Sequence, residues 1–355
     1  MAQQWNHRLV RASQAWARMP QTAGGEIDWA DVAVAHLDTG YSEHPCFGPW
    51  NGGLSTILQT AKAKSYVAPL NGAGRDPFIE TGIQTPGHGT KTCSVIAGIE
   101  GTRFTGLAPQ VPVIPFRVTD SSLVTSRVAR AIGRALRNVA DNKLAPVVSI
   151  SLGYPLLSGS EMGRAVDHAY EKGVIIVAAG GQVIDRTTYP GKHLRTIGVG
   201  GITRYRAAGQ WKHRIYAVYD SYSRIDSWAP AEPIGRATPH RDYSGVGNPA
   251  DLYGSGDGSG DGTSYATAHV AAAAVLWCRF HGWAALRQTY GRGWDLVEAF
   301  RQCLFKSEQA FRMPANKQPQ GARGKLLDID KLLQVALPDP ADLRKEADLA
   351  ADDRM

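Results

Sequence analysis

Short apolar runs alternate with amphipathic segments along most of this 355-residue chain, and that alternation restricts its fold more than any other feature. A strand that is followed by a helix and then by another strand belongs to a parallel sheet that helices cover on both faces. The sequence therefore predicts an α/β fold in three layers, with a mostly parallel central sheet. The expected strands are 32–37, 111–118, 147–152, 174–179 and 196–202, and the expected helices are 126–138, 162–172 and 263–280, followed by 283–305.

Three short motifs place Asp, His and Ser at the ends of these elements. Asp38 follows the first expected strand, His88 opens a helix after Gly87, and Ser264 opens another after Gly262-Thr263. A serine hydroxyl becomes a nucleophile when histidine takes its proton and a carboxylate orients that histidine. The motifs therefore predict a triad of Asp38, His88 and Ser264, with the Ser264 N–H as an oxyanion donor. The alternative is three coincidental glycine-flanked turns.

The motifs and their surroundings resemble the subtilases, a family of serine peptidases. The segments that carry the resemblance are VAVAHLDTGYSEHP (32–45), GHGTKTCSVIAG (87–98), TGLAP (105–109), VSISLG (148–153), IVAAG (176–180), YPGK (189–192) and GTSYATAHVAAAAV (262–275). The order Asp, His, Ser is the order in subtilisin. The resemblance implies a subtilisin-like domain over 30–336, which leaves an N-terminal extension at 1–29. The residues at 337–355 are charged with few large apolar side chains, which predicts a flexible tail.

The resemblance also implies where a peptide substrate lies. Segment 151–154, which is Ser151, Leu152, Gly153 and Tyr154, would pair with the peptide as an added strand. Segment 178–180, which is Ala178, Ala179 and Gly180, would form the other wall of the main pocket. The alternative for both segments is an ordinary buried parallel strand. Tyr154 either narrows the pocket or folds onto the surface.

The chain departs from the family at the second oxyanion donor. Subtilases usually have Asn directly after Ala-Ala-Gly, and here that position is Gly181, followed by Gln182. Either Gln182 supplies the donor, or a water or backbone N–H does, or turnover is low. The loss of one such donor slows an enzyme by about 10²–10³ without abolishing its activity.

No metal or other cofactor is expected. The family's His-Pro-Asp, whose carboxylate usually helps to bind calcium, is His44-Pro45-Cys46 here, and Arg103 stands in the loop that would supply other ligands, where Glu100 alone could serve. The acids Asp251, Asp257 and Asp261 lie in or beside a glycine-rich stretch that lacks EF-hand spacing and is interpreted as a loop. His36, His269 and Cys93 are interpreted as structural residues.

Composition limits partners and location. The net charge is +7, but there is no RNP pattern, zinc-finger spacing or basic run, so no nucleic-acid partner is expected. No apolar run reaches the roughly 18 residues of a membrane span, and no secretory signal precedes the domain. The four cysteines have no CxxC spacing and favour reduced, buried thiols, so a cytoplasmic location is expected. The oligomeric state is left open.

These inferences together predict a serine endopeptidase that acts on peptides or proteins through an acyl-enzyme. Two alternatives remain open at this point. One is a catalytically weak or dead subtilisin-like protein that binds peptides, which is suggested by Gly181 because glycine has no side chain to donate to an oxyanion. The other is a peptide ligase or cyclase, because an amine can replace water in releasing the same acyl-enzyme.

Overall fold

The computed structural model describes most of the chain. The described residues are 4–68, 73–79, 84–101, 104–121, 126–153, 160–182, 186–208, 210–217, 224–240, 252–255, 261–307, 309, 321–322 and 326–346. Every structural statement below concerns these residues. Tyr154, Asp251, Asp257 and Arg103 lie outside them, so the predictions about these four residues are not addressed.

A central sheet of eight strands organises the molecule. Seven strands are parallel, in the order β11-β8-β7-β6-β1-β5-β2, and β9 adds to β8 in the antiparallel sense. The predicted mostly parallel sheet is therefore confirmed. The strands are β1 (Val34–Asp38), β2 (Lys64–Ser65), β5 (Val113–Arg117), β6 (Val147–Ile150), β7 (Ile175–Ala179), β8 (Ile197–Ala207), β9 (Gln210–Ile215) and β11 (Ser227–Glu232). Strand β11 is not among the strands that the sequence predicted.

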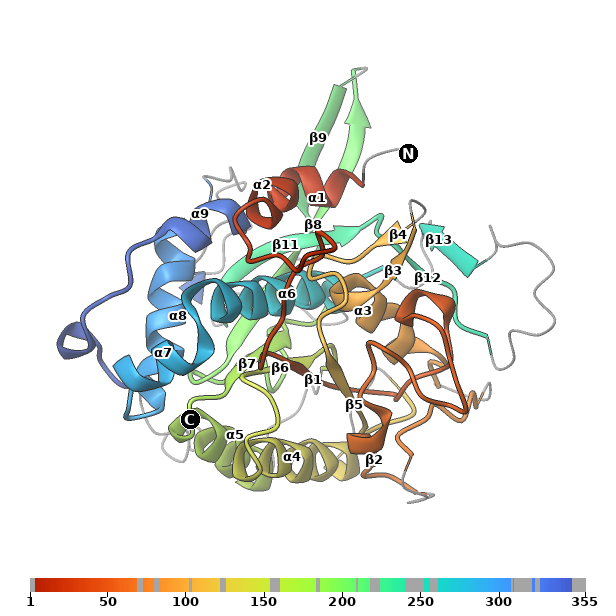
Figure 1. The fold of residues 1–355 in the computed structure, drawn as a ribbon, viewed down its shortest axis with the longest axis horizontal. Coiled ribbons are helices and arrows are strands. Elements are labelled where there is room, and N and C mark those ends of the chain that lie inside the picture. Colours follow the sequence, from red (N-terminus) through yellow and green to blue (C-terminus); the bar gives the residue numbers. More distant parts are fainter. Residues whose placement is uncertain are drawn as a thin grey trace.

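Helices cover both faces of this sheet (Figure 1). Helices α4 (Ser126–Asp141) and α5 (Ser160–Glu171) pack on one face, against alternate residues of β1, β6 and β7 such as Leu37, Ile150 and Ile176. The long α6 (Thr263–His281) packs on the other face, in a core that includes Val34, Val147 and Val177. Because both faces of each strand are covered, the strands are continuous apolar runs in the sequence rather than alternating ones.

Further elements complete these layers. They are α3 (His88–Ala97), α7 (Trp283–Thr289), α8 (Trp294–Ser307), α9 (Ile329–Gln334) and the short pairs β3 (Ile99–Glu100) with β4 (Phe104–Thr105), β10 (Arg224–Ile225) with β14 (Gly321–Ala322), and β12 (Gly235–Ala237) with β13 (Tyr253–Ser255). The expected continuous segment 283–305 is divided between α7 and α8. Gly293 has φ +80° there, and a Cβ on it would lie 2.1 Å from the Glu171 carbonyl oxygen, so the chain turns where only glycine fits.

The segment before residue 30 packs against the sheet domain. It forms two short helices, α1 (Trp5–Leu9) and α2 (Ala12–Trp16), which the sequence did not predict. Val10 and Ala12 are fully buried in the same core as α6. The indole of Trp16 donates to the Leu107 carbonyl at 2.7 Å. Short helices of this length depend on tertiary packing rather than on intrinsic propensity.

The segment after α9 is also held against the domain, at least as far as Glu346. Leu343 is 2% exposed, and the Arg195 guanidinium donates to the Glu346 carbonyl at 3.0 Å. The backbone N–H of Glu346 donates to the Tyr170 hydroxyl at 3.1 Å. The flexibility expected for 337–355 therefore does not apply to 337–346, because long-range polar contacts fix residues that local composition suggests are loose.

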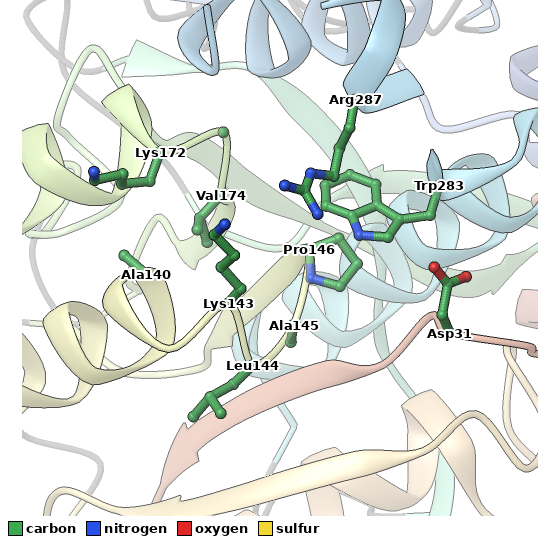
Figure 2. Close-up of a pocket in the computed structure, with 11 residues that line it drawn as sticks. Asp31, Ala140, Lys143, Leu144, Ala145, Pro146, Lys172, Val174, Trp283 and Arg287 are labelled. Atoms are coloured by element: carbon green, nitrogen blue, oxygen red, sulfur yellow. The ribbon is translucent and has the colours of Figure 1, made fainter. Parts of the chain in front are cut away.

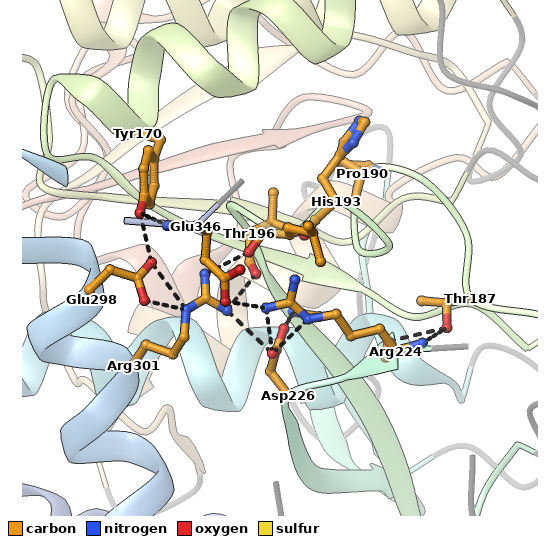
Figure 3. Close-up of polar contacts among 12 residues, drawn as sticks. Tyr170, Thr187, Pro190, His193, Thr196, Arg224, Asp226, Glu298, Arg301 and Glu346 are labelled. Carbon is orange, nitrogen blue, oxygen red and sulfur yellow. Dashed lines mark hydrogen bonds and ion pairs between the residues drawn. The ribbon is translucent and has the colours of Figure 1, made fainter. Parts of the chain in front are cut away.

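These contacts belong to a buried polar cluster (Figure 3). Arg301 lies at its centre and contacts Asp226 at 3.2 Å and Glu298 at 3.1 Å. Arg224 contacts the same Asp226 oxygen at 3.0 Å. Burial raises the pKa of Glu298, while the Arg301 cation opposes this shift. The cluster joins α5, α8 and the segment before β11, so its charges are compensated only when these elements are assembled.

We expect Arg301→Met to lower the free energy of unfolding by about 3–5 kcal/mol, because it leaves the carboxylate of Asp226 buried with one cation fewer. Urea or thermal unfolding of the purified protein measures this change. Arg75→Met is the control, since Arg75 is 51% exposed and pairs with the partly exposed Glu43. Its loss should cost less than about 1 kcal/mol. Equal stabilities of the two variants would contradict the structural role assigned to the cluster.

Within the described part of the chain, no helix combines the length and the apolar character that crossing a membrane requires.

Candidate active site

The three predicted triad residues lie together at the carboxyl edge of the sheet. Asp38 ends β1, His88 begins α3, and Ser264 lies in the first turn of α6. The Nδ1 atom of His88 lies 2.7 Å from Oδ1 of Asp38, and its Nε2 atom lies 3.2 Å from Oγ of Ser264. These residues are 50 and 176 positions apart in sequence, so the fold alone brings them into hydrogen-bond reach.

The carboxylate of Asp38 is fully buried and has several donors. Its Oδ1 atom accepts from the Thr39 N–H at 2.7 Å as well as from His88, and its Oδ2 atom lies 3.3 Å from the Thr92 hydroxyl. Burial acts to raise the pKa of Asp38, but the charge and hydrogen bond of His88 oppose burial, and the net direction is downward. A carboxylate in this state holds the Nδ1–H tautomer of the imidazole.

Glycines allow the triad elements to approach closely. A Cβ atom on Gly89 would lie 2.1 Å from the Gly40 carbonyl oxygen, and one on Gly87 would lie 2.2 Å from Pro239. Gly87 also has φ +70°, which disfavours other residues. Gly89 therefore lets α3 approach the segment after Asp38, and Gly87 lets the start of α3 approach Pro239.

Two serines connect the end of β6 to the start of α6. The Ser264 hydroxyl donates to the Ser151 carbonyl at 2.9 Å, and the Ser151 hydroxyl donates to the Ser264 carbonyl at 2.9 Å. A hydroxyl has one hydrogen, so Ser264 donates either to Ser151 or to His88 Nε2 at a given moment. Activation of Ser264 therefore requires its hydrogen to turn from Ser151 toward His88.

The backbone at the start of α6 provides an oxyanion donor. The Thr263 N–H donates to Oε1 of Gln182 at 2.8 Å, and the Tyr265 N–H donates to the Gly262 carbonyl. Among the described residues, no acceptor is bonded to the Ser264 N–H, which lies between them. Such an N–H at a helix start carries partial positive charge and suits a developing oxyanion beside Ser264 Oγ.

Gln182 lies across the start of α6. A Cβ on Gly262 would come within 2.5 Å of both terminal atoms of the Gln182 side chain. Gly262 therefore leaves room for the Gln182 side chain. The oxygen of Gln182 is held by Thr263, while its Nε2 atom makes only a 3.4 Å contact with the Asp261 carbonyl. The amide nitrogen has two hydrogens, so one of them is left for a further acceptor.

Gly181 cannot readily be replaced by the family's asparagine. Its φ is +88°, and an added Cβ would lie 2.7 Å from Cγ2 and 2.8 Å from Oγ1 of Thr188. An asparagine at this position would therefore strain the backbone and displace Thr188. Thr188 also lies against Gly153, where an added Cβ would meet its hydroxyl at 2.5 Å.

The expected substrate-binding segments meet at this site with mixed side-chain roles. Ala178 and Leu152 are buried in the core that α4 and α5 cover, so they offer only backbone to a substrate. Gly180 accepts the Thr188 N–H at 2.9 Å and donates to the Val199 carbonyl. Thr188 thus lies between Gly153 and Gly181, at the ends of the two expected walls. Thr188 could not be identified from the sequence, because its distance along the chain from either wall does not follow the period of a helix or of a strand.

Metal ligands do not gather anywhere in the described residues. No group of three or more His, Cys, Asp or Glu side chains there has the geometry to hold a metal ion. Cys46 is fully buried, and Asp261 pairs with Arg236 at 3.4 Å. All four cysteines are buried free thiols, and burial raises the pKa of Cys93 well above its ordinary value. Cys93 is therefore no rival nucleophile.

A pocket away from the triad lies at the amino edge of the sheet (Figure 2). Lys143, Lys172, Arg287, Trp283 and Asp31 line it. Helices α4 and α5 end at Asp141 and Glu171, so Lys143 and Lys172 follow these ends within two residues. Lysines beside helix carboxyl ends are favoured by the helix dipole, which explains their position without a ligand.

Comparison with known proteins agrees with this geometry. The subtilase family profile matches residues 30–320, so the chain belongs to the subtilase family. The chain is 27% identical to thermitase of Thermoactinomyces vulgaris over 258 residues, which is 67% of this chain and 79% of thermitase. It is 29% identical to subtilisin DY of Bacillus licheniformis over 200 residues, 54% of this chain and 62% of that protein. The structure is similar to fervidolysin of Fervidobacterium pennivorans, with TM-score 0.64 and 20% identity over 94% of this chain and 46% of that one.

Proposed function

We propose that this protein is a serine endopeptidase in which Asp38, His88 and Ser264 form the catalytic triad. The observation that carries the proposal is the continuous chain of contacts from Asp38 Oδ1 through His88 to Ser264 Oγ, at 2.7 and 3.2 Å. Membership of the subtilase family supports peptides or proteins as substrates.

The reaction follows from the positions of these groups. Ser264 Oγ attacks the scissile carbonyl carbon while His88 Nε2 takes its proton, and the Ser264 N–H donates to the oxyanion. The imidazolium then gives the proton to the departing amine, which leaves an acyl-enzyme on Ser264. Water, deprotonated by His88, releases the acid and restores the serine. Asp38 keeps its charge throughout and stabilises the imidazolium.

A fluorophosphonate probe tests the proposal directly. It forms a covalent bond only with an activated serine, so intact-mass spectrometry should show one adduct, and peptide mapping should place it on Ser264. Cleavage of a peptide library then reports turnover. The second candidate, a protein that binds peptides without cutting them, rests on the absence of a side chain at Gly181. Peptide binding without labelling would favour that candidate.

We propose Gln182 as the second oxyanion donor, and Gln182→Glu tests this role. Glutamate keeps an oxygen that accepts from the Thr263 N–H, but it removes the amide hydrogens and adds negative charge beside the oxyanion. We expect kcat to fall by about 10²-fold or more, with little change in KM. The melting temperature should not fall, because an acid is favoured at a helix start.

Gln182→Ala is the companion variant, since it removes both the donor and the acceptor. It should lower kcat and also the melting temperature, because the Thr263 N–H loses its partner. If both variants retain wild-type kcat, Gln182 only caps the helix, and a backbone group or water serves the oxyanion.

A further inference from the structure

A second histidine lies behind the triad carboxylate. His36 precedes Asp38 by two positions on β1, so both side chains point to the same face of the sheet, where α3 packs. His36 is 1% exposed. Its Nε2 atom lies 2.9 Å from the Thr92 hydroxyl and 3.8 Å from Oδ2 of Asp38. The sequence-based interpretation of His36 as a purely structural residue did not foresee this contact with the triad.

Thr92 joins this histidine to Asp38. It lies one helical turn after His88 on α3, and its Oγ1 atom is 3.3 Å from Asp38 Oδ2. The same oxygen lies 3.0 Å from the His88 carbonyl and 3.3 Å from the Gly89 carbonyl. The hydroxyl has one hydrogen and so can satisfy only one of these acceptors, whereas its oxygen can accept from the His36 N–H.

The two carboxylate oxygens of Asp38 accept hydrogen bonds from different donors. Oδ1 accepts from Thr39 and from His88, both at 2.7 Å. Among the described residues, the only hydrogen-bond donor to Oδ2 is the Thr92 hydroxyl, at 3.3 Å. A hydrogen bond to one carboxylate oxygen stabilises the anion and draws charge away from the other oxygen. A hydrogen bond from His36 to the Thr92 oxygen strengthens the bond from the Thr92 hydroxyl to Oδ2, because hydrogen bonds in a chain polarise one another.

We propose that His36 and Thr92 form a relay that holds Oδ2 of Asp38 and thereby sets the pH at which His88 gains its proton. The hydrogen bonds run from His36 Nε2–H to Thr92 Oγ1, and from the Thr92 hydroxyl to Asp38 Oδ2. No proton is transferred along this chain. Both residues are positioning residues, and the inference rests on the catalytic triad proposed above.

The surroundings support a neutral His36 with a single N–H. Burial lowers the pKa of His36, and this effect outweighs the attraction of Asp38. Strands β5 and β6 present Pro115 and Ser149 opposite His36. The titratable or charged groups packed around His36 and Asp38 are His88 and Cys93 of α3, Tyr265 of α6 and Asp76 before α3, while Arg117 of β5 is turned toward Asp120.

The sign of the effect follows from the charge on Asp38. Without a donor at Oδ2, more negative charge remains at Oδ1, which faces His88. A more negative Oδ1 favours the imidazolium, so His88 should keep its proton to higher pH. Loss of the relay is therefore expected to move the acid limb of kcat/KM upward, which a merely structural histidine would not do.

Thr92→Val is the main test, because it removes the hydroxyl and keeps the shape. We expect the acid limb of kcat/KM to move upward by roughly half a pH unit, about a threefold change in the protonation constant. NMR titration of ¹³C-labelled histidine should show the same shift for His88 without requiring turnover. Thr92→Ser retains a hydroxyl and should keep the wild-type midpoint.

Variants of His36 test the first bond of the relay. His36→Leu should move the midpoint in the same direction as Thr92→Val, and His36→Gln should restore it in part, since an amide can donate to Thr92. The double variant Thr92→Val/His36→Leu should show the Thr92→Val midpoint, because His36 acts through that hydroxyl. His269→Gln is the control. His269 is a fully buried histidine on α6 that bonds Tyr265 and Asn6, and its loss should leave the midpoint unchanged.

The relay proposal and the peptidase proposal can be disproved independently of each other. An unshifted His88 midpoint in folded Thr92→Val and His36→Leu, or additive shifts in the double variant, would overturn the relay even if the enzyme is active. Absence of fluorophosphonate labelling in the wild-type protein would overturn the peptidase, while the NMR titration would still decide whether His36 and Thr92 act on His88.

Discussion

Replacing Ser264 by alanine should abolish fluorophosphonate labelling and lower kcat by roughly 10⁶-fold, the loss found when the nucleophile of subtilisin is removed. The reason is that, among the described residues, Ser264 is the only one whose hydroxyl lies within hydrogen-bond reach of His88 Nε2, at 3.2 Å. Labelling followed by intact mass, and initial rates on a cleaved peptide, measure the two effects.

The fold should survive this substitution. Alanine is smaller than serine, and the hydroxyl's contacts with the Ser151 carbonyl and with His88 Nε2 are the ones lost. Ser307→Ala is the matched control, since it removes a fully buried hydroxyl that donates to the Leu304 carbonyl at 2.8 Å, away from the triad. It should keep full labelling. Cleavage by Ser264→Ala at the wild-type rate would refute the serine-peptidase mechanism.

Asp38→Asn should lower kcat by about 10⁴-fold, the size of this effect in a serine peptidase of a different fold. Asp38 is fully buried, so its charge is screened little by water when the imidazolium forms beside it. An asparagine has nearly the same shape but neither the charge nor two equivalent acceptor oxygens. Rates measured between pH 6 and pH 10 separate loss of charge from a change in the pH at which His88 titrates.

A second Asp–His pair on the surface offers the control. Asp141 contacts His168 Nε2 at 2.5 Å, and the two side chains are 56% and 30% exposed. Asp141→Asn should leave kcat unchanged, because this pair lies at the other edge of the sheet from Ser264. A loss for Asp38→Asn no larger than that for Asp141→Asn would show that Asp38 does not support His88.

Local sequence patterns were enough to predict the strands and helices that carry the candidate site. Apolar runs such as 147–152 are long enough and free enough of charge to indicate buried strands, and the structure has β6 at Val147–Ile150. Gly173 directly follows the helix expected at 162–172, and its φ of +79° is typical of a glycine that ends a helix. Asp38, His88 and Ser264 were identifiable because each follows or opens such an element.

Contacts between distant segments could not be inferred in this way. Gln182 meets Thr263 across 81 positions, and His36 meets Thr92 across 56. Helices α1 and α2 are likewise too short to be specified by propensity. The one local signal for the relay was that Thr92 follows His88 by four positions, and therefore lies on the same face of α3.

The sequence by itself determined the class of fold, the family and the identity of the three candidate catalytic side chains, because periodicity and short glycine-flanked motifs are properties of neighbouring residues. The tertiary structure alone decided that Gln182 caps α6, that Thr188 lies between Gly153 and Gly181, and that His36 reaches Asp38 through Thr92. It also decided that Glu346 is held by Arg195 rather than loose. These outcomes depend on distances of a few ångströms between elements far apart in the chain, which packing sets and local pattern does not encode.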